Sequence, residues 1–596
     1  MAHLIESIQQ AATAFIQDEW GVEVAPETLV VQDTKKEFEG DFTLVVFPLT
    51  RFKLGAPPQI AEKLGAGLRD RLPQIADYNV IKGFLNLSLT DAAWIEYLAE
   101  SSSDANYHRN STGKGQKVVV EYPSPNTNKP LHLGHLRNIV LGSSLINILD
   151  ANGYDVTPVC LFNDRGTNIS KSMYAWMEAG LNDSPESTGK MGDKFVGDYY
   201  VAFAKKHKAE KDALIAGGMT DREAENATES MKAVHELTLK WENGDPEVRK
   251  LWETMNGWVY EAFDHTFKRL GISFDKFYYE SQVYQRGKET VEEGLEKGLF
   301  VKEDDGSITV DLTDDKLDKK VLLRSNGTSL YITQDLAIAA DKETDYGMDK
   351  SIYVVGNEQD YHFKVLFKIL EKLEKPYAKG LFHLSYGMVD LPSGKMKSRE
   401  GTTVEAEDLM DEMIQKALEE TKEKGKIEGM TEEDMNELTR KLGLSALKYF
   451  LAKVDPKKRM LFDPKESIDI QGHTGPFIQY SYTRTAALAR KREAVTELVA
   501  GVNLEDSLHE NERLLLRRLF RYNEVLQEAA DSNSPALMAN YAYELARDFN
   551  RFYHGDKILQ QEKPNTSAFR FALASFTGRL IRESMALLGI EMPERM

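Results

Sequence analysis

Two histidines separated by a leucine and a glycine are the sharpest candidates for chemistry, in the tetrapeptide His132-Leu133-Gly134-His135. They stand where a short β-branched segment passes through a loop into a segment with helical periodicity. The start of a helix presents free backbone N–H groups and the positive end of the helix dipole, which favours anions. Two imidazoles one turn apart add donors for a triphosphate, and Gly134 leaves room for a nucleotide to stack on the backbone. The alternative interpretation is that both histidines only cap the helix.

A second candidate is the basic, glycine-flanked segment 394–401, Gly-Lys-Met-Lys-Ser-Arg-Glu-Gly, which follows a strand-like stretch ending at Val389. Lys395 and Lys397 on such a loop suit the negative charge that develops on a leaving pyrophosphate. Taken alone, a solvated lysine turn is the commoner meaning of this pattern. Its position, downstream of the histidine motif in a second strand-and-helix half, favours the functional interpretation.

The elements around these motifs predict an α/β fold. Segment 116–122 reads as a buried strand, 133–152 as a helix that stops at Gly153, and 155–162 as a second strand. This β–loop–α–β order is typical of a doubly wound parallel sheet. Alternation resumes further on, at segments 329–338, 351–355, 362–373 and 382–389.

The two ends of the chain have a different character. Residues 1–110 read as a small mixed α+β unit, followed by a polar, breaker-rich linker at 101–115. Helical patterns dominate from about residue 409 onward, which predicts an all-α C-terminal bundle. The expected helices are 442–454, 483–499, 510–531, 535–553 and 567–588.

Composition excludes several classes of protein. The chain has 596 residues, 41% hydrophobic, with 75 basic and 95 acidic residues and a net charge of −20. That composition is typical of a folded multidomain protein, and no apolar run approaches the roughly 18 residues that cross a bilayer. The single cysteine, Cys160, cannot form an intramolecular disulfide or a cysteine-based zinc site. With no signal-like N-terminus, we expect a cytoplasmic protein; the global charge neither supports nor excludes an RNA partner.

Together the two motifs resemble the HIGH and KMSKS motifs of class I aminoacyl-tRNA synthetases, and the wider match resembles the arginyl-tRNA synthetase family. The matching segments are 121–137 (EYPSPNTNKPLHLGHLR), 331–335 (YITQD), 359–363 (QDYHF), 475–480 (GPFIQY) and 593–596 (PERM). The second motif reads KMKSR, which leaves open which lysine takes which role. Gln334 stands where many relatives carry arginine.

The resemblance implies ATP-dependent activation of L-arginine to arginyl-adenylate, followed by transfer to the terminal adenosine of tRNA(Arg). The implied catalytic residues are His132, His135, Lys395 and Lys397. ATP would meet Lys129, Gly134, Gly387, Met388 and Val389. Mg²⁺ is expected with ATP, without a dedicated protein cage, and no structural zinc is expected.

Arginine would be held by carboxylates, because a guanidinium is planar, permanently charged and suited to bidentate pairing. The resemblance assigns this pocket to Glu121, Asn126, Tyr331, Asp335 and Gln359. Without it, Asp335 reads equally well as a helix N-cap. Segment 163–166, Asn-Asp-Arg-Gly, would either line the pocket or form a turn.

For tRNA, the resemblance implies contacts by Phe84, Asn86, Tyr480, Arg484 and Met596, with Tyr482 and the basic run 490–492 as further candidates. The alternatives are a core position for Phe84, a solvated helix face for the basic run, and a frayed tail for Met596.

The implied architecture is a Rossmann-like catalytic domain at 111–175 and 321–405 with a connective insertion at 176–320. It is flanked by an N-terminal tRNA-elbow domain at 1–110, a helical stem at 406–470 and an α-helical anticodon-binding domain at 471–596. We expect a monomer. The rival hypotheses are a stand-alone nucleotidyltransferase and a catalytically silent, tRNA-binding paralogue.

Overall fold

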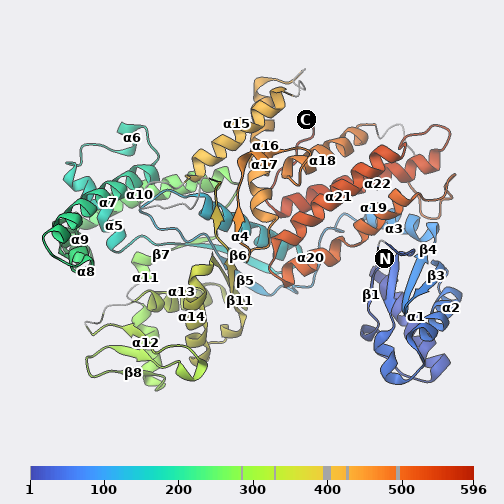
Figure 1. The fold of residues 1–596 in the computed structure, drawn as a ribbon, viewed down its shortest axis with the longest axis horizontal. Helices are drawn as coiled ribbons and strands as arrows, with labels where there is room; N and C mark the ends of the chain where they lie inside the picture. Colours follow the sequence, from blue (N-terminus) through green and yellow to red (C-terminus); the bar gives the residue numbers. More distant parts are fainter. Residues whose placement is uncertain are drawn as a thin grey trace.

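The computed structural model describes residues 2–35, 37–283, 286–325, 327, 330–392, 404–423, 429–491 and 497–596. Figure 1 shows an elongated molecule with the N-terminal unit (blue) at one end and the helices α7 to α9 (green) at the other. The sheet with the two-histidine motif lies between them. None of the described helices is long and apolar enough to cross a bilayer.

The N-terminal unit is an antiparallel sheet in the order β1-β2-β4-β3, packed against helices. Strand β4 reads Phe-Leu-Asn-Leu-Ser-Leu, and its Leu85, Leu87 and Leu89 are buried, as alternation in a half-buried strand predicts. The mixed α+β prediction is confirmed. The elements are α1 (Ala2–Trp20), β1 (Val31–Asp33), β2 (Phe42–Val45), α2 (Pro57–Arg71), β3 (Ile75–Ile81), β4 (Phe84–Leu89) and α3 (Asp91–Ser103).

The central sheet has five parallel strands in the order β12-β11-β5-β6-β7. The chain enters at β5, winds outward to β6 and β7, and then returns to the other side of β5 for β11 and β12. This confirms the doubly wound prediction and puts the topological switch point between β5 and β11. The strands are β5 (Lys117–Glu121), β6 (Asp155–Phe162), β7 (Lys276–Tyr279), β11 (Lys350–Gly356) and β12 (Leu381–Tyr386).

Strand β7 lies inside the stretch 176–320, which the sequence suggested to be a continuous insertion, yet it pairs with β6 as the edge strand of the central sheet. Its four residues, Lys-Phe-Tyr-Tyr, are too few to show a period among charged helical segments. The helices before it are α5 (Thr167–Glu178), α6 (Pro185–Thr188), α7 (Gly192–Ala216), α8 (Asp221–Ala227), α9 (Glu229–Glu242) and α10 (Pro246–Arg269).

A small antiparallel sheet, β10-β9-β8, and two short helices follow β7 before the chain rejoins the central sheet. Helix α4 and two later helices, α13 and α14, pack on the sheet. The elements are α4 (Leu133–Ala151), α11 (Glu280–Val283), α12 (Gly287–Glu296), β8 (Phe300–Lys302), β9 (Ile308–Val310), β10 (Lys320–Leu323), α13 (Tyr331–Tyr346) and α14 (Asp360–Lys372). Short 3₁₀ helices span Pro26–Thr28, Phe47–Phe52, Thr313–Asp315, Asn357–Gln359 and Ala378–Gly380.

The C-terminal part is helical, as predicted, with one short parallel pair, β13 with β14. The helix expected at 483–499 begins earlier, at Gly475, because the Thr474 side chain accepts a hydrogen bond from Phe477 N–H and Pro476 suits a first turn. The elements are β13 (Val389–Asp390), α15 (Ala406–Glu423), α16 (Glu432–Ala452), β14 (Met460–Leu461), α17 (Pro464–Ile468), α18 (Gly475–Ala489), α19 (Glu510–Phe520), α20 (Tyr522–Asp531), α21 (Pro535–Gly555) and α22 (Pro564–Leu587).

The N-terminal unit docks against α19 of the C-terminal bundle (Figure 1). The Phe520 ring lies 5.2 Å from Phe42 and 5.7 Å from Tyr97, centroid to centroid. Arg513 pairs with Asp91, and Arg517 donates to the carbonyl of Gly40 at 3.0 Å. An aromatic core with charged pairs around it therefore joins the two ends of the chain.

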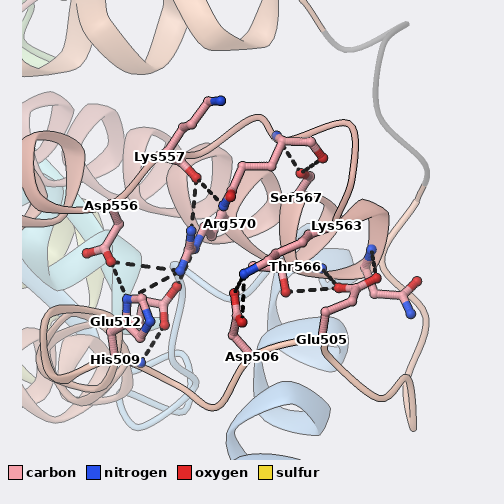
Figure 2. Close-up of polar contacts among 12 residues, drawn as sticks. Glu505, Asp506, His509, Glu512, Asp556, Lys557, Lys563, Thr566, Ser567 and Arg570 are labelled. Carbon is pink, nitrogen blue, oxygen red and sulfur yellow. Dashed lines mark hydrogen bonds and ion pairs between the residues drawn. The ribbon is translucent and has the colours of Figure 1, made fainter.

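A polar cluster joins the start of α19 to α22, with Glu512, Asp556 and Arg570 buried and His509 exposed (Figure 2). Arg570 Nε donates to Glu512 Oε1 at 2.6 Å, and His509 Nδ1 lies 2.5 Å from Asp556 Oδ1. Among the described residues, His509, Glu512 and Asp556 are the one group of three metal-ligating side chains close enough together to hold a metal ion. The Arg570 guanidinium lies among them, 2.6 Å from Glu512 Oε1 and 3.8 Å from Asp556 Oδ1, and so offsets part of the charge of the two carboxylates.

Candidate active site

His132 and His135 stand at the first turn of α4, directly after the loop that leaves β5. His132 is the N-cap residue, and its Nδ1 accepts a hydrogen bond from Gly134 N–H at 3.1 Å. His135 Nδ1 accepts from His132 N–H, also at 3.1 Å, and the two rings lie 3.9 Å apart. The cap interpretation is therefore correct as far as it goes, but it uses only one nitrogen of each ring.

The protonation state of the two rings follows from these contacts. A neutral imidazole that accepts at Nδ1 carries its proton on Nε2, so each ring has an Nε2–H with which to donate. Burial, with Lys129 nearby, lowers the pKa of His132 to about 4. Burial, with His132 and Lys129 nearby, also lowers the pKa of His135 well below its ordinary value. Both side chains are thus neutral donors at pH 7.

Gly134 leaves little room for a side chain at the start of α4. A Cβ built on this glycine would meet only the His132 ring, at 3.0 Å, among described atoms outside the helix backbone. A flat group can therefore approach the backbone here, whereas a side chain would crowd the histidine.

The backbone at Gly387 lies close to a neighbouring segment and is tied to α4. A Cβ on Gly387 would lie 2.6 Å from the carbonyl carbon of Lys458, so only glycine fits this approach. The fully buried Arg137 of α4 donates to the carbonyls of Gly387 at 2.6 Å and of Pro456 at 3.2 Å. Met388 is exposed and Val389 is buried in the β13–β14 pair. Arg137 is the last residue of the first matching segment, 121–137, but nothing in the sequence predicted a role for it.

Lys395 and Lys397 lie outside the described residues. The residues that follow their loop are bonded to the histidine motif: Leu133 N–H donates to the Val404 carbonyl at 3.2 Å, and Ala406 N–H donates to the Leu131 carbonyl at 2.8 Å. Val404 and Ala406 therefore lie beside the histidine motif.

All five parallel strands end at the same edge of the sheet, and each is followed directly by candidate or polar residues. Glu121 ends β5, Asn163 and Asp164 follow β6, and Glu280 follows β7. The 3₁₀ turn with Gln359 follows β11, and Gly387 follows β12. This is the edge at which open α/β sheets bind their ligands.

Three carboxylates gather at this edge, on Glu121, Asp335 and Glu280. Glu121 is buried, and its Oε2 lies 2.5 Å from Lys342 Nζ. Asp335 Oδ2 lies 2.5 Å from His362 Nε2; burial raises the pKa of Asp335, and the nearby Glu121 raises it further. Asp335 lies in the second turn of α13, so it is not the N-cap of that helix. The cluster has the charge that a guanidinium requires.

Nothing in the sequence pointed to Glu280, because the short strand β7 that directly precedes it was not predicted. Burial raises its pKa to about 7, with Asp164 and Asp335 adding to the effect and Arg165 opposing it. Tyr331, one turn before Asp335, is largely exposed, at 72% of its surface. It interacts electrostatically with Glu280 and Arg165, so it belongs to the same cluster.

The residues of segment 163–166 are more than a turn. Asp164 is fully buried and accepts hydrogen bonds from Ser281 N–H, Ser281 Oγ and Tyr260 Oη at 2.7–2.9 Å. Arg165 pairs with Glu242 of α9 at 2.8 Å. The segment therefore connects the strand ends to the helical insertion.

The remaining predicted pocket residues lie near the same edge of the central sheet but are more exposed. Asn126, in the loop after β5, is exposed, and its backbone forms an isolated β-bridge with Asn163. Gln359 is exposed. Lys129 lies near both histidines, and its positive charge lowers their pKa values.

The N-terminal tRNA candidates differ from one another. Phe84 is partly buried, with its ring 5.1 Å from the exposed Phe47 ring. Asn86 is buried, accepts from Thr43 Oγ1 at 2.6 Å and donates to Asn79 Oδ1 at 2.9 Å. Its amide is therefore used inside the sheet rather than presented to a partner.

In the C-terminal bundle, Tyr480, Arg484 and Met596 come together. The Arg484 guanidinium lies 4.8 Å from the Tyr480 ring centroid, and Tyr480 and Met596 line one apolar pocket. The chain end is packed rather than frayed. Tyr482, by contrast, is buried and bonds Glu594 at 2.9 Å, so it cannot stack on a base here.

A doubly wound sheet whose strand ends meet a histidine-containing helix start is expected of a class I aminoacyl-tRNA synthetase, and two family models assign the chain to that class. Residues 99–462 match tRNA synthetases class I (R), catalytic domain, and residues 478–596 match the DALR anticodon binding domain. The resemblance noted in the sequence is thereby confirmed at the level of class.

Relatives narrow the class to one family. The chain is 50% identical to an arginine–tRNA ligase of Bacteroides thetaiotaomicron over 97% of both chains, and 48% identical to that of Porphyromonas gingivalis over the full length of both. The arginyl-tRNA synthetase structure from Thermus thermophilus superimposes with a TM-score of 0.75 at 23% identity, covering 100% of both chains, which supports the fold. The chain belongs to the arginyl-tRNA synthetase family. It is a ligase that activates arginine and charges tRNA in translation.

Proposed function

We propose that the edge of the central sheet is divided into an ATP half and an arginine half. The ATP half consists of the α4 start and the Gly387 backbone. The Nε2–H groups of His132 and His135 donate to phosphate oxygens, and Lys129 adds charge. Gly134 lies under the nucleotide, and the backbone of Gly387 to Val389 meets adenine. The observation that supports this arrangement is the pair of Nδ1 acceptors, which directs both ring protons away from the helix backbone.

Lys395 and Lys397 complete the ATP half in this proposal. The first described residue after them is Val404, whose carbonyl accepts a hydrogen bond from Leu133 N–H. Two ammonium groups there would stabilise the pyrophosphate as it leaves. Mg²⁺ would travel with ATP and neutralise phosphate charge, because this ion is usually held largely by the substrate phosphates.

The arginine half consists of Asp335, Glu280 and Tyr331 around the guanidinium, with Glu121, Asn126 and Gln359 near the polar groups of the amino acid. Its carboxylates favour a forked, permanently charged group. Lysine would leave buried acceptors unpaired, which is the physical reason for its rejection. The gathering of Asp335 and Glu280 from different elements supports this assignment most strongly.

For tRNA, we propose that Tyr480, Arg484 and Met596 meet unstacked anticodon bases, since aromatic and guanidinium planes stack on bases. Phe84, beside the exposed Phe47, would meet the elbow of the tRNA, with Asn86 holding its strand. The domain boundaries given by the sequence remain our proposal, with β7 counted in the catalytic sheet. We further propose a cytoplasmic monomer.

Substitution of Asp335 by Asn tests the arginine half. We expect the arginine KM in ATP–pyrophosphate exchange to rise at least tenfold, because a neutral amide cannot form the bidentate ion pair with a guanidinium, while the ATP KM stays the same. The matched control is Asp345→Asn on the same helix, whose carboxylate pairs with Lys276 at 2.5 Å. Exchange should be measured with and without tRNA, and with lysine as a competing substrate. Unchanged arginine kinetics in D335N would refute the assignment.

A further inference from the structure

A fully buried lysine lies beneath the proposed arginine pocket. Lys342 is on α13, seven residues after Asp335, so its side chain leaves the helix on the same face as those of Asp335 and Tyr331. Its Nζ lies 2.5 Å from Glu121 Oε2 and 4.0 Å from the Tyr353 ring centroid. A buried ammonium group is tolerated only when it is paired, and here its partner is a residue at the end of β5.

The pair sits among other charged groups from several elements. Asp335 faces Glu121 from β5, Glu280 from α11, His362 from α14 and Lys342 from its own helix. Glu121 and Asp335 are like charges close together in a poorly solvated place, an arrangement that favours uptake of a proton. Lys342 and His362 are the groups that oppose this uptake at Asp335.

We propose that Lys342 is a positioning residue for arginine recognition: its ammonium group neutralises Glu121 and so leaves Asp335 with the negative charge that receives the guanidinium. Lys342 has no direct contact with substrate in this proposal, which rests on the arginine half of the proposed site. The negative charge available to arginine then comes from Asp335 and Glu280. Glu121 stays oriented between Lys342 and Ser124, whose Oγ donates to Glu121 Oε1 at 3.1 Å.

The alternative is that Lys342 only holds β5 and α13 together. The variant Lys342→Gln separates the two roles, because a glutamine amide can still donate a hydrogen bond to Glu121 but carries no charge. Lys342→Arg keeps the charge with a larger head group. Lys448→Gln is the matched control: Lys448 is also buried, but it donates to the carbonyls of Leu270 and Gly589, at 2.8 and 2.6 Å, in the helical part of the molecule.

The experiment is arginine KM in tRNA-dependent exchange, with the full-length protein, at pH 6 to 8, with ATP KM and thermal melting recorded for each variant. At pH 8, where Glu280 is ionised, we expect K342Q to raise the arginine KM at least tenfold. The KM of K342Q should also fall more steeply with rising pH than that of the wild type, because arginine must displace a second proton. We expect K342R to stay within about threefold of the wild type and K448Q to change melting without changing the arginine KM.

A folded K342Q with wild-type arginine KM and pH profile would overturn the proposal and leave Lys342 as a structural tie. If K342Q does not fold, K342R still decides, since a folded K342R with a tenfold higher arginine KM would show that charge is not what matters. The variant D335N distinguishes failure of the proposed arginine site from failure of the role proposed for Lys342. If D335N leaves the arginine KM unchanged, the proposed site fails; if D335N raises it and K342Q does not, only the role of Lys342 fails.

Discussion

Glu280 offers a test in which activity and stability should change in opposite directions. Its carboxyl is buried at the start of α11, directly after β7, and burial raises its pKa to about 7 from an ordinary 4.5. In the proposed site the ionised form receives the guanidinium. Arginine should therefore bind weakly at pH 6, where most of Glu280 is protonated, and more tightly at pH 8.

The size of both effects follows from that pKa. The ionised fraction rises from about one tenth at pH 6 to about nine tenths at pH 8, so the arginine KM should fall about tenfold over this range. The free energy of unfolding, in contrast, should fall as the pH rises. In the unfolded chain Glu280 ionises near pH 4.5 and in the folded chain near pH 7. Above pH 7 the buried carboxylate of Glu280 is deprotonated and lowers the free energy of unfolding by about 3 kcal/mol; below pH 4.5 this destabilisation is absent.

The assay compares wild type with Glu280→Gln in ATP–pyrophosphate exchange from pH 6 to 8 and in urea unfolding at pH 8. We expect E280Q to have a high arginine KM that no longer depends on pH, an unchanged ATP KM, and a free energy of unfolding about 3 kcal/mol above wild type at pH 8. A wild-type arginine KM that is flat between pH 6 and 8, or an E280Q variant that binds arginine like wild type at pH 8, would refute the reasoning.

Three further predictions concern the remaining parts of the molecule. His135→Ala removes one phosphate donor and should lower the exchange rate about 10²–10³-fold, while tRNA binding measured by filter retention stays the same. Arg137→Met removes the donor to the buried Gly387 carbonyl, while the Pro456 carbonyl still accepts from Gly387 N–H at 2.9 Å; urea unfolding should show a loss of about 1–3 kcal/mol, and the ATP KM should rise, whereas an unaltered ATP KM would mean that this contact does not position the nucleotide. Arg484→Met should raise the dissociation constant for tRNA about tenfold, with an unchanged arginine KM at saturating tRNA; equal tRNA affinity would remove Arg484 from the interface.

Long elements with a clear period could be predicted from the sequence, and short ones could not. Helix α4 and strand β6 lie where their patterns predicted, because each has a buried face and Gly153 ends the helix. Strand β7 is four residues long, which is too short to show a hydrophobic period. Glu280, which follows it, was therefore not predicted as a pocket residue. The break between α19 and α20 at Arg521 has no glycine or proline to mark it.

Candidate residues followed the same division. The histidine motif was predictable because its spacing and its place at a helix start point to the same chemistry. The ion pair of Glu121 with Lys342 and the bonds from Arg137 join residues more than 200 positions apart, so they depend on tertiary packing that no local pattern reports. Asn86 illustrates the reverse case, since a polar side chain in a strand gave no sign that its amide is used internally.

The aromatic contact between Phe520 and the N-terminal unit has a consequence for biosynthesis. Phe42 and Tyr97 leave the ribosome early, but the ring that covers them belongs to a residue more than 400 positions later. At about 5–20 residues per second, the first domain waits on the order of 20–80 s with that aromatic face uncovered. During this interval the nascent chain presents a surface to which chaperones can bind, and the finished molecule hides it only when its last helices close over its first strands.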